Sequence, residues 1–171
     1  GAVGGVLERP VTGLGVPEQG DGLFEGEAGS PVQGAQTVVV VEALAAARVV
    51  NATVGAIATS GPRGPGSAAT KPLTNGYDDT YAAFAVDADA TSKAAFTFSP
   101  GAGKPVDAPV FRIRNFTARS VPVIRVGGVA LRVNTGAADA DAFVSLDEAR
   151  NELWITMNSS FAADATIQVG E

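Results

Sequence analysis

Apolar and polar residues alternate with a period of two through the last third of the chain. In Val110–Arg114, Phe111 and Ile113 point to one side of an extended backbone, and the two arginines point to the other. Further segments of this kind are Val123–Val126, Val129–Val133, Phe143–Leu146, Leu153–Met157 and Ala165–Val169. The side chains expected to face the core are Phe111, Ile113, Leu153, Ile155, Met157, Ile167 and Val169. This period predicts antiparallel strands with one buried side.

Tight-turn residues separate these segments. Gly127-Gly128 lies between two β-branched runs, and glycine adopts the positive φ angles that two-residue hairpin turns require. A polar turn at Asp147–Asn151 separates the next two segments. Strand-turn-strand order without an intervening helical pattern is typical of a β-sandwich or barrel.

The first half of the chain is less regular. Val38–Val41 and Val49–Ile57 favour strands, because β-branched side chains lose rotamer freedom in helices, although residues 42–48 have helical propensity. We expect two long strands here, joined by a bulge or one helical turn. The Gly- and Pro-rich residues 60–76 are expected to form a loop. Strands are expected at Thr80–Val86 and Ala94–Ser99.

These patterns predict an all-β fold, an antiparallel β-sandwich of immunoglobulin-like or jelly-roll type with about nine to eleven strands. Residues 1–34 differ from the rest, with ten glycines and three prolines. Such a segment buries too little apolar surface to offset its ordering entropy. We expect residues 1–34 to be an extended arm that lies against its own domain or a neighbouring subunit, and residues 35–171 to be one domain.

Two residue types are missing from the sequence, and their absence narrows the chemistry. The chain has no cysteine and no histidine. It therefore cannot form Ser-His-Asp or Cys-His catalytic pairs, disulfides, or the Cys and His ligand sets of common zinc sites. An enzyme built on this chain would have to move protons with carboxylates, Lys or Tyr. A non-catalytic role is expected.

The charge is acidic and unevenly distributed. The net charge is −6, and Glu8, Glu18, Asp21, Glu25 and Glu27 against Arg9 give residues 1–34 a charge of −4, which leaves −2 for the rest. Nucleic acid is therefore not an expected partner, because its binding depends on clustered Lys and Arg. No apolar run has the roughly eighteen residues that a membrane span needs. Gly1 in place of Met indicates processing or trimming.

Four arginines are the first candidate binding residues. Arg112, Arg114, Arg125 and Arg132 fall opposite the apolar positions of their segments. Guanidinium groups bind carboxylate and sulfate in a bidentate manner, so an arginine face could hold an anionic polysaccharide or the acidic arm of a subunit. The alternative is that these are ordinary solvent-facing positions, where long polar side chains cover apolar surface.

Two aspartate pairs are candidate metal ligands. Asp87 and Asp89, like Asp139 and Asp141, are two residues apart, which points both carboxylates to one side of an extended backbone. Oxygen ligands in this arrangement suit calcium, although a full site needs six or more oxygens. The alternative is that the aspartates are turn residues. No other cofactor is expected.

Trp154 is the third candidate, together with Tyr77 and Tyr81. An exposed aromatic ring on a sheet can stack on a sugar, and Trp154 is expected on the side opposite Leu153 and Ile155. The alternative is that a single tryptophan packs under a loop or between two sheets.

The stretches Ala108–Phe116, Val123–Val133 and Asn151–Thr156 resemble the C-terminal β-sandwich accessory modules of secreted bacterial polysaccharide-acting proteins. They cover about a third of the chain, and no single motif among them is specific. The resemblance implies export and an accessory role without catalytic residues.

The expected function is therefore that of an exported, non-catalytic assembly subunit, a homo-oligomer whose arm docks on a neighbouring subunit. Its expected location is extracellular or in a virion or cell-surface assembly. Two alternatives stay open: a glycan-binding accessory module, and one chain of a larger multi-chain enzyme.

Overall fold

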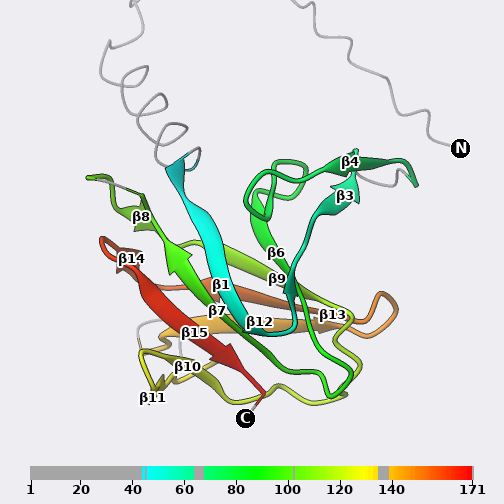
Figure 1. Ribbon diagram of the computed structural model, residues 1–171. Coiled ribbons are helices and arrows are strands. Elements are labelled where there is room, and N and C mark those ends of the chain that lie inside the picture. The colour runs from blue at the N-terminus through cyan, green and yellow to red at the C-terminus, as the bar shows by residue number, and fades with distance from the viewer. Residues whose placement is uncertain (1–43, 45, 64–67, 102, 135–138, 171) are drawn as a thin grey trace, which may run out of the picture.

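The computed structural model describes residues 44, 46–63, 68–101, 103–134 and 139–170 (Figure 1). The expected arm at residues 1–34 and the expected strand at Val38–Val41 lie outside the described residues.

Two larger sheets and two small two-stranded sheets make up the described part. The first sheet has the order β1 (Arg48–Val54), β7 (Ala94–Ser99), β15 (Ala165–Val169), β10 (Ile124–Val126) and β11 (Val129–Ala130). The second has the order β12 (Ala142–Asp147), β13 (Glu152–Met157), β9 (Val110–Arg114), β6 (Ala83–Asp87) and β2 (Ala56–Ile57), with β5 (Tyr77–Asp78) also paired to β6. The small pairs are β3 (Ser60–Pro62) with β4 (Thr70–Pro72), and β8 (Val106–Asp107) with β14 (Ser160–Phe161).

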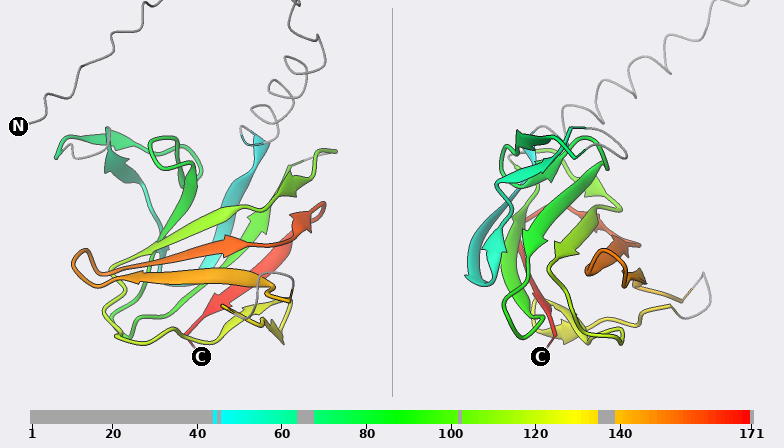
Figure 2. Two further views of the ribbon diagram at one scale, coloured as in Figure 1. Left: turned by 180° about the vertical axis from the view of Figure 1, so that it is seen from behind. Right: turned by 90° about the vertical axis from the view of Figure 1, so that its right-hand side faces the viewer.

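The two larger sheets pack face to face around an aromatic core, as the two layers in Figure 2 show. Phe98 of β7 meets Phe111 of β9 edge to face, with ring centroids 5.2 Å apart. Phe96 of β7 lies 5.5 Å from the same ring, and Phe84 of β6 lies 5.0 Å from Phe98. These contacts join strands of opposite sheets, so the arrangement is that of a β-sandwich.

The all-β prediction is confirmed, and the expected strands at Ala94–Ser99 and Val110–Arg114 coincide with β7 and β9. The seven side chains expected to face the core are all buried. The described residues contain fifteen strands, more than expected, because five of them have only two residues. One pair departs from the antiparallel prediction, since β6 runs parallel to β9.

Other expectations need correction. Residues 60–76 are not all loop, because β3 and β4 pair there, with Pro62 opposite Thr70. Proline is tolerated in such an edge pair, where a missing N–H breaks no central ladder. The strand expected at Thr80–Val86 begins only at Ala83, after a turn in which Ala82 has a φ of 51°.

The expected pair of long strands over the chain up to Ile57 is described only in its second half. There, β1 and β2 are separated at Gly55, and the register of β1 against β7 shifts between Val50 and Val54. Asn51 has a φ of 50° within this irregular stretch. A β-bulge of this kind twists an edge strand away from regular pairing.

Candidate functional site

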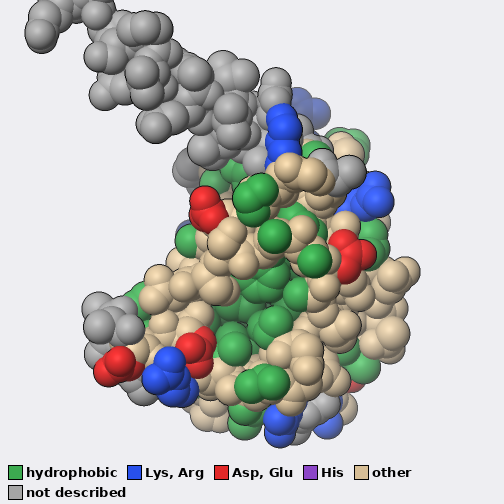
Figure 3. All heavy atoms as spheres, turned by 90° about the vertical axis from the view of Figure 1, so that its left-hand side faces the viewer, with side chains coloured by type: hydrophobic (Ala, Val, Ile, Leu, Met, Phe, Trp, Pro, Cys, Tyr) green, Lys and Arg blue, Asp and Glu red, His purple; other side chains and the backbone are tan. Residues whose placement is uncertain are grey.

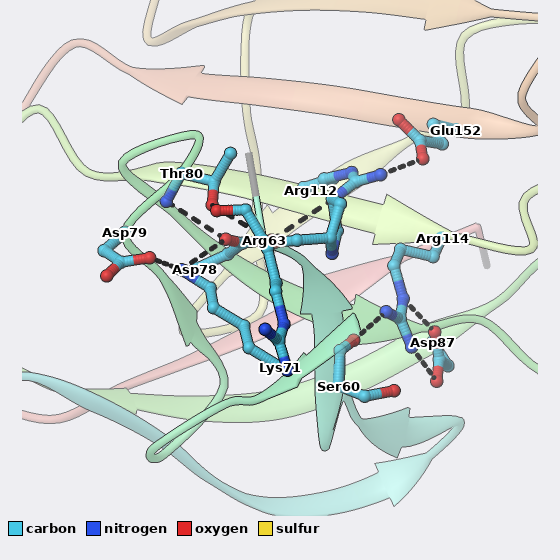
Figure 4. A network of polar contacts seen from close by, with 11 residues as sticks. Ser60, Arg63, Lys71, Asp78, Asp79, Thr80, Asp87, Arg112, Arg114 and Glu152 are labelled. Carbon is cyan, nitrogen blue, oxygen red and sulfur yellow. Dashed lines mark hydrogen bonds and ion pairs between the residues drawn. The ribbon is translucent and has the colours of Figure 1, made fainter. Parts of the chain in front are cut away.

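Arg112 is the centre of a buried cluster of charged side chains on the outer face of the second sheet (Figure 4). Its Nη2 donates to Oε1 of Glu152, and its Nη1 lies 3.5 Å from Oδ2 of Asp78. Asp78 is fully buried, and Arg112 and Glu152 are each 6% exposed. The backbone alternation that sends Phe111 and Ile113 into the core sends Arg112 to the opposite face.

Two aromatic rings cover the Arg112 guanidinium. Its central carbon lies 4.5 Å from the ring centroid of Tyr81 and 5.4 Å from that of Trp154. The two rings meet edge to face, with centroids 5.7 Å apart. Trp154 is directly opposite Arg112 in the β13–β9 register. Cation–π attraction in this desolvated setting adds to the ion pairs.

Asp78 also receives partners from the turn that covers the sheet. The backbone N–H of Thr80 donates to Oδ1 of Asp78 at 3.1 Å, and Nζ of Lys71 lies 3.6 Å from the same oxygen. Lys71 forms a second ion pair with the exposed carboxylate of Asp79. The cluster therefore fastens β4 and β5 to the outer face of β9 and β13.

Arg114 forms a second, separate ion pair on the same face. Its Nε donates to Oδ1 of Asp87 at 2.6 Å, its Nη2 donates to Oδ2 at 2.8 Å, and its Nη1 donates to the carbonyl of Ser60. The bidentate hydrogen bonds to Asp87 raise the pKa of Arg114, against the opposing effect of burial. The charge of Arg114 is thus neutralised within the domain.

The four candidate arginines do not share one face. Arg125 lies in β10 of the other sheet, where its Nη1 donates to the carbonyl of Gly128. Arg132 follows β11 and binds Asp141 through Nε and Nη2, at 3.2 and 3.1 Å. This ion pair lowers the pKa of Asp141 and raises the pKa of Arg132. Arg112 and Arg114 alone come together, on the face that carries Trp154.

The two members of each aspartate pair do not act together, because they interact with different groups. Asp87 binds Arg114, whereas Asp89 accepts from the backbone N–H groups of Thr91 and Lys93 in a turn. Asp141 binds Arg132, and Asp139 is exposed. Nowhere in the described part of the chain do three acidic side chains gather as a metal ion would require. The turn alternative accounts for Asp89, since the hydrogen bonds from Lys93 and Thr91 also lower its pKa.

A groove of about 630 Å³ with a mixed polar and apolar lining lies at one end of the sandwich, between the β10–β11 hairpin and the chain around β14. Its polar side chains are those of Arg132, Asp141, Asn158, Ser159 and Ser160. Figure 3 shows hydrophobic side chains at the bottom of a hollow on this side, with charged side chains beside it. The apolar side chains that line it are Val126, Val129, Ala130, Leu131, Ala140, Met157, Phe161, Ala162, Ala163 and Ala165. Met157 and Phe161 are buried beneath the groove, and its accessible apolar surface comes from side chains such as Val129 and Ala163.

Two large apolar side chains on β11 and β12 are exposed. Val129 is 69% exposed, although it belongs to the segment Val129–Val133, in which apolar and polar residues alternate. Phe143, on the edge strand β12, is 40% exposed. The alternation of apolar and polar residues gives no sign of the groove. Its local signal in the sequence is the run of short side chains at Ala162 and Ala163, which leaves the space unfilled.

No model of a known protein family matches the chain, and no curated protein is similar to it in sequence. Within the described ranges, no helix is both long and apolar enough to cross a membrane.

Proposed function

We propose that the chain is an exported, non-catalytic assembly subunit whose N-terminal arm docks on a neighbouring copy. The observation that carries this proposal is the open groove, where the exposed side chains of Val129, Ala162 and Ala163 line a hollow on the surface of the described residues. Exposed apolar hollows on soluble proteins mark interaction sites.

The polar side chains favour the same choice over a glycan site. The charge of Arg112 is paired with Glu152 and Asp78, and Arg114 makes bidentate hydrogen bonds to Asp87, all inside the domain. A sulfate or carboxylate on a polysaccharide would have to displace these partners and leave carboxylates buried and unpaired, which is costly. The groove needs no such displacement.

The molar mass in solution tests the proposal. Light scattering coupled to size-exclusion chromatography should give a multimer for the full chain and a monomer for a variant lacking residues 1–34. Circular dichroism should show the same β spectrum for both. Multimers that persist after the deletion would exclude the arm, and a monomeric full chain retained on anionic polysaccharide would favour a glycan-binding module instead.

A further inference from the structure

The groove offers main-chain hydrogen-bonding groups as well as apolar side chains. Val126 pairs with Val129 next to the hairpin turn, and the backbone N–H of Leu131 donates to the carbonyl of Ile124 at 2.8 Å. Ala130 lies between these two positions, opposite Arg125. Because hydrogen-bonded and non-hydrogen-bonded pairs alternate along an antiparallel ladder, the N–H and C=O of Ala130 point away from β10.

Only a short segment can pair with this edge. One residue further along, the backbone N–H of Arg132 donates to Oδ2 of Asp141, and its carbonyl accepts from the N–H of Asp141. Among the described residues, the outer edge of β11 is therefore already hydrogen-bonded at Arg132, whereas the main-chain N–H and C=O of Ala130 are available for pairing. An extended peptide that pairs at Ala130 gains two main-chain hydrogen bonds there, and its alternate side chains enter the groove.

We propose that the groove binds residues 11–16 of the arm of a neighbouring copy as an added strand on β11, with Leu14 and Val16 as the apolar anchors. This inference rests on the proposed function and names the docking surface for it. The short side chains of Ala162, Ala163 and Ala165 leave the space that Leu14 and Val16 fill.

The sequence of the arm supports this segment. In Val11-Thr12-Gly13-Leu14-Gly15-Val16, Leu14 and Val16 fall on one side of an extended backbone, and Gly13 and Gly15 leave the other side without bulk. Pro10 and Pro17 bracket the segment. A residue before proline favours extended backbone, so Val16 is biased towards the strand conformation, and neither proline can prolong the pairing.

The connecting chain is long enough to reach a second copy. Val16 and Leu44, the first described residue, are 28 positions apart. An extended chain of that length spans up to about 95 Å. A domain of this size has a radius of gyration of about 14 Å, so the arm can pass beyond its own domain to a neighbour.

Cysteine cross-linking tests the contact directly, because the chain has no cysteine of its own. Full-length Leu14→Cys and Ala163→Cys chains, co-expressed and oxidised, should give a disulfide-linked dimer on a non-reducing gel. Ala149→Cys replaces Ala163→Cys in the control, since Ala149 is equally an exposed alanine but lies in the turn at the opposite end of β12 and β13. Equal cross-linking to both positions would overturn the proposal.

Two full-length variants test the same contact without cross-linking. Ala163→Asp places a charge at an exposed groove position, and Leu14→Asp places one on the anchor. Each should weaken the assembly at least tenfold in dissociation constant, whereas Ala149→Asp should leave it unchanged. In the Leu14→Cys/Ala163→Cys double variant, the main product should be a disulfide between two chains. A mainly intramolecular disulfide would mean that the arm folds onto its own groove.

The results separate the two proposals. If the full chain assembles through residues 1–34 but Ala163→Asp leaves the assembly unchanged, the groove is not the docking surface and the proposed function stands. If the full chain is monomeric, the proposed function fails, and the docking of a neighbour's arm fails with it.

Discussion

Arg112 and Trp154 are cross-strand partners on β9 and β13, and the guanidinium carbon of Arg112 lies 5.4 Å from the centroid of the indole ring. The residue expected to bind a glycan through an open charge and the residue expected to stack on one are therefore packed against each other. Tyr81 covers the same guanidinium, and Glu152 and Asp78 neutralise it. Arg112 therefore has a structural role, because it holds together the side chains on the outer face of the second sheet.

Replacement of Arg112 should strongly destabilise the fold. Arg112→Met leaves the carboxylates of Asp78 and Glu152 buried without their cation, and breaking a buried ion pair in this way costs about 3–5 kcal/mol in the free energy of unfolding. Urea unfolding followed by the fluorescence of Trp154, the one tryptophan of the chain, measures this directly.

Two further variants control this measurement. Arg150→Met removes only the exposed pair with Asp147, at 3.5 Å, and should change the free energy of unfolding by less than about 1 kcal/mol. Arg112→Lys keeps the charge but loses the guanidinium plane that reaches both Glu152 and Asp78, and its free energy of unfolding should fall between those of the other two variants. Equal stability of Arg112→Met and the unchanged protein would contradict the role given to the cluster.

Gly61 should not tolerate even a methyl group. A Cβ at this position would lie 2.5 Å from Oδ2 of Asp78, which is itself fully buried and held by Arg112. Gly61→Ala must displace the carboxylate or the β3 backbone, at a cost of about 1–3 kcal/mol. Thermal unfolding should show a lower melting temperature, and the effect should shrink in an Asp78→Ala background, where the obstacle is gone. An unchanged melting temperature for Gly61→Ala would show that β3 moves freely.

Asn134 should protect the edge of β12 from pairing with another chain. Its amide mimics a neighbouring strand, since Nδ2 donates to the carbonyl of Val144 at 2.9 Å and Oδ1 accepts from the N–H of Val144 at 2.7 Å. Asn134 has a φ of 53°, so Asn134→Gly removes the amide without adding backbone strain. We expect a loss of about 1–2 kcal/mol and concentration-dependent association through the opened edge.

Sedimentation at several protein concentrations measures that association. Asn134→Asp is a second variant, which keeps an acceptor for the N–H of Val144, loses the donor and adds a negative charge at the edge. It should associate less than Asn134→Gly. Association that does not differ between the unchanged protein and Asn134→Gly would show that other features protect this edge.

Acid should destabilise the domain partly through Asp89. The hydrogen bonds from Lys93 and Thr91 lower the pKa of Asp89 below its ordinary value of 3.8. A carboxyl group with a lowered folded-state pKa contributes stability above its unfolded pKa and loses that contribution as pH falls through the folded value. Asp89→Asn keeps an acceptor for the turn but has no such titration.

Melting temperatures between about pH 5 and pH 2.5 test this expectation. The decline with falling pH should be shallower for Asp89→Asn than for the unchanged protein. Asp164→Asn, at an exposed position in the loop before β15, serves as the charge-matched control. Parallel declines in all three proteins would contradict a stabilising role of the Asp89 turn.

The alternation of apolar and polar residues predicts one part of the candidate site and not another. Alternation correctly predicted that Arg112 and Trp154 lie on the faces opposite Phe111 and Leu153. It could not predict that Arg112 and Trp154 share one face, because this depends on the pairing of β9 with β13, in which these two partners are 42 positions apart in the sequence. Nor could it predict that residues near Asp78 fold over Arg112 and bury it.

The sequence by itself determined the all-β fold, the Gly127-Gly128 turn and the buried side of strands such as β9, β13 and β15, because backbone geometry couples side-chain direction to neighbouring positions. Tertiary structure alone decided which charges neutralise one another and where the core is left open. Arg112 meets Glu152 only through the β9–β13 pairing, and the groove exists only because short side chains near β14 fail to fill the end of the sandwich. Both outcomes depend on contacts between distant segments, which no local period encodes.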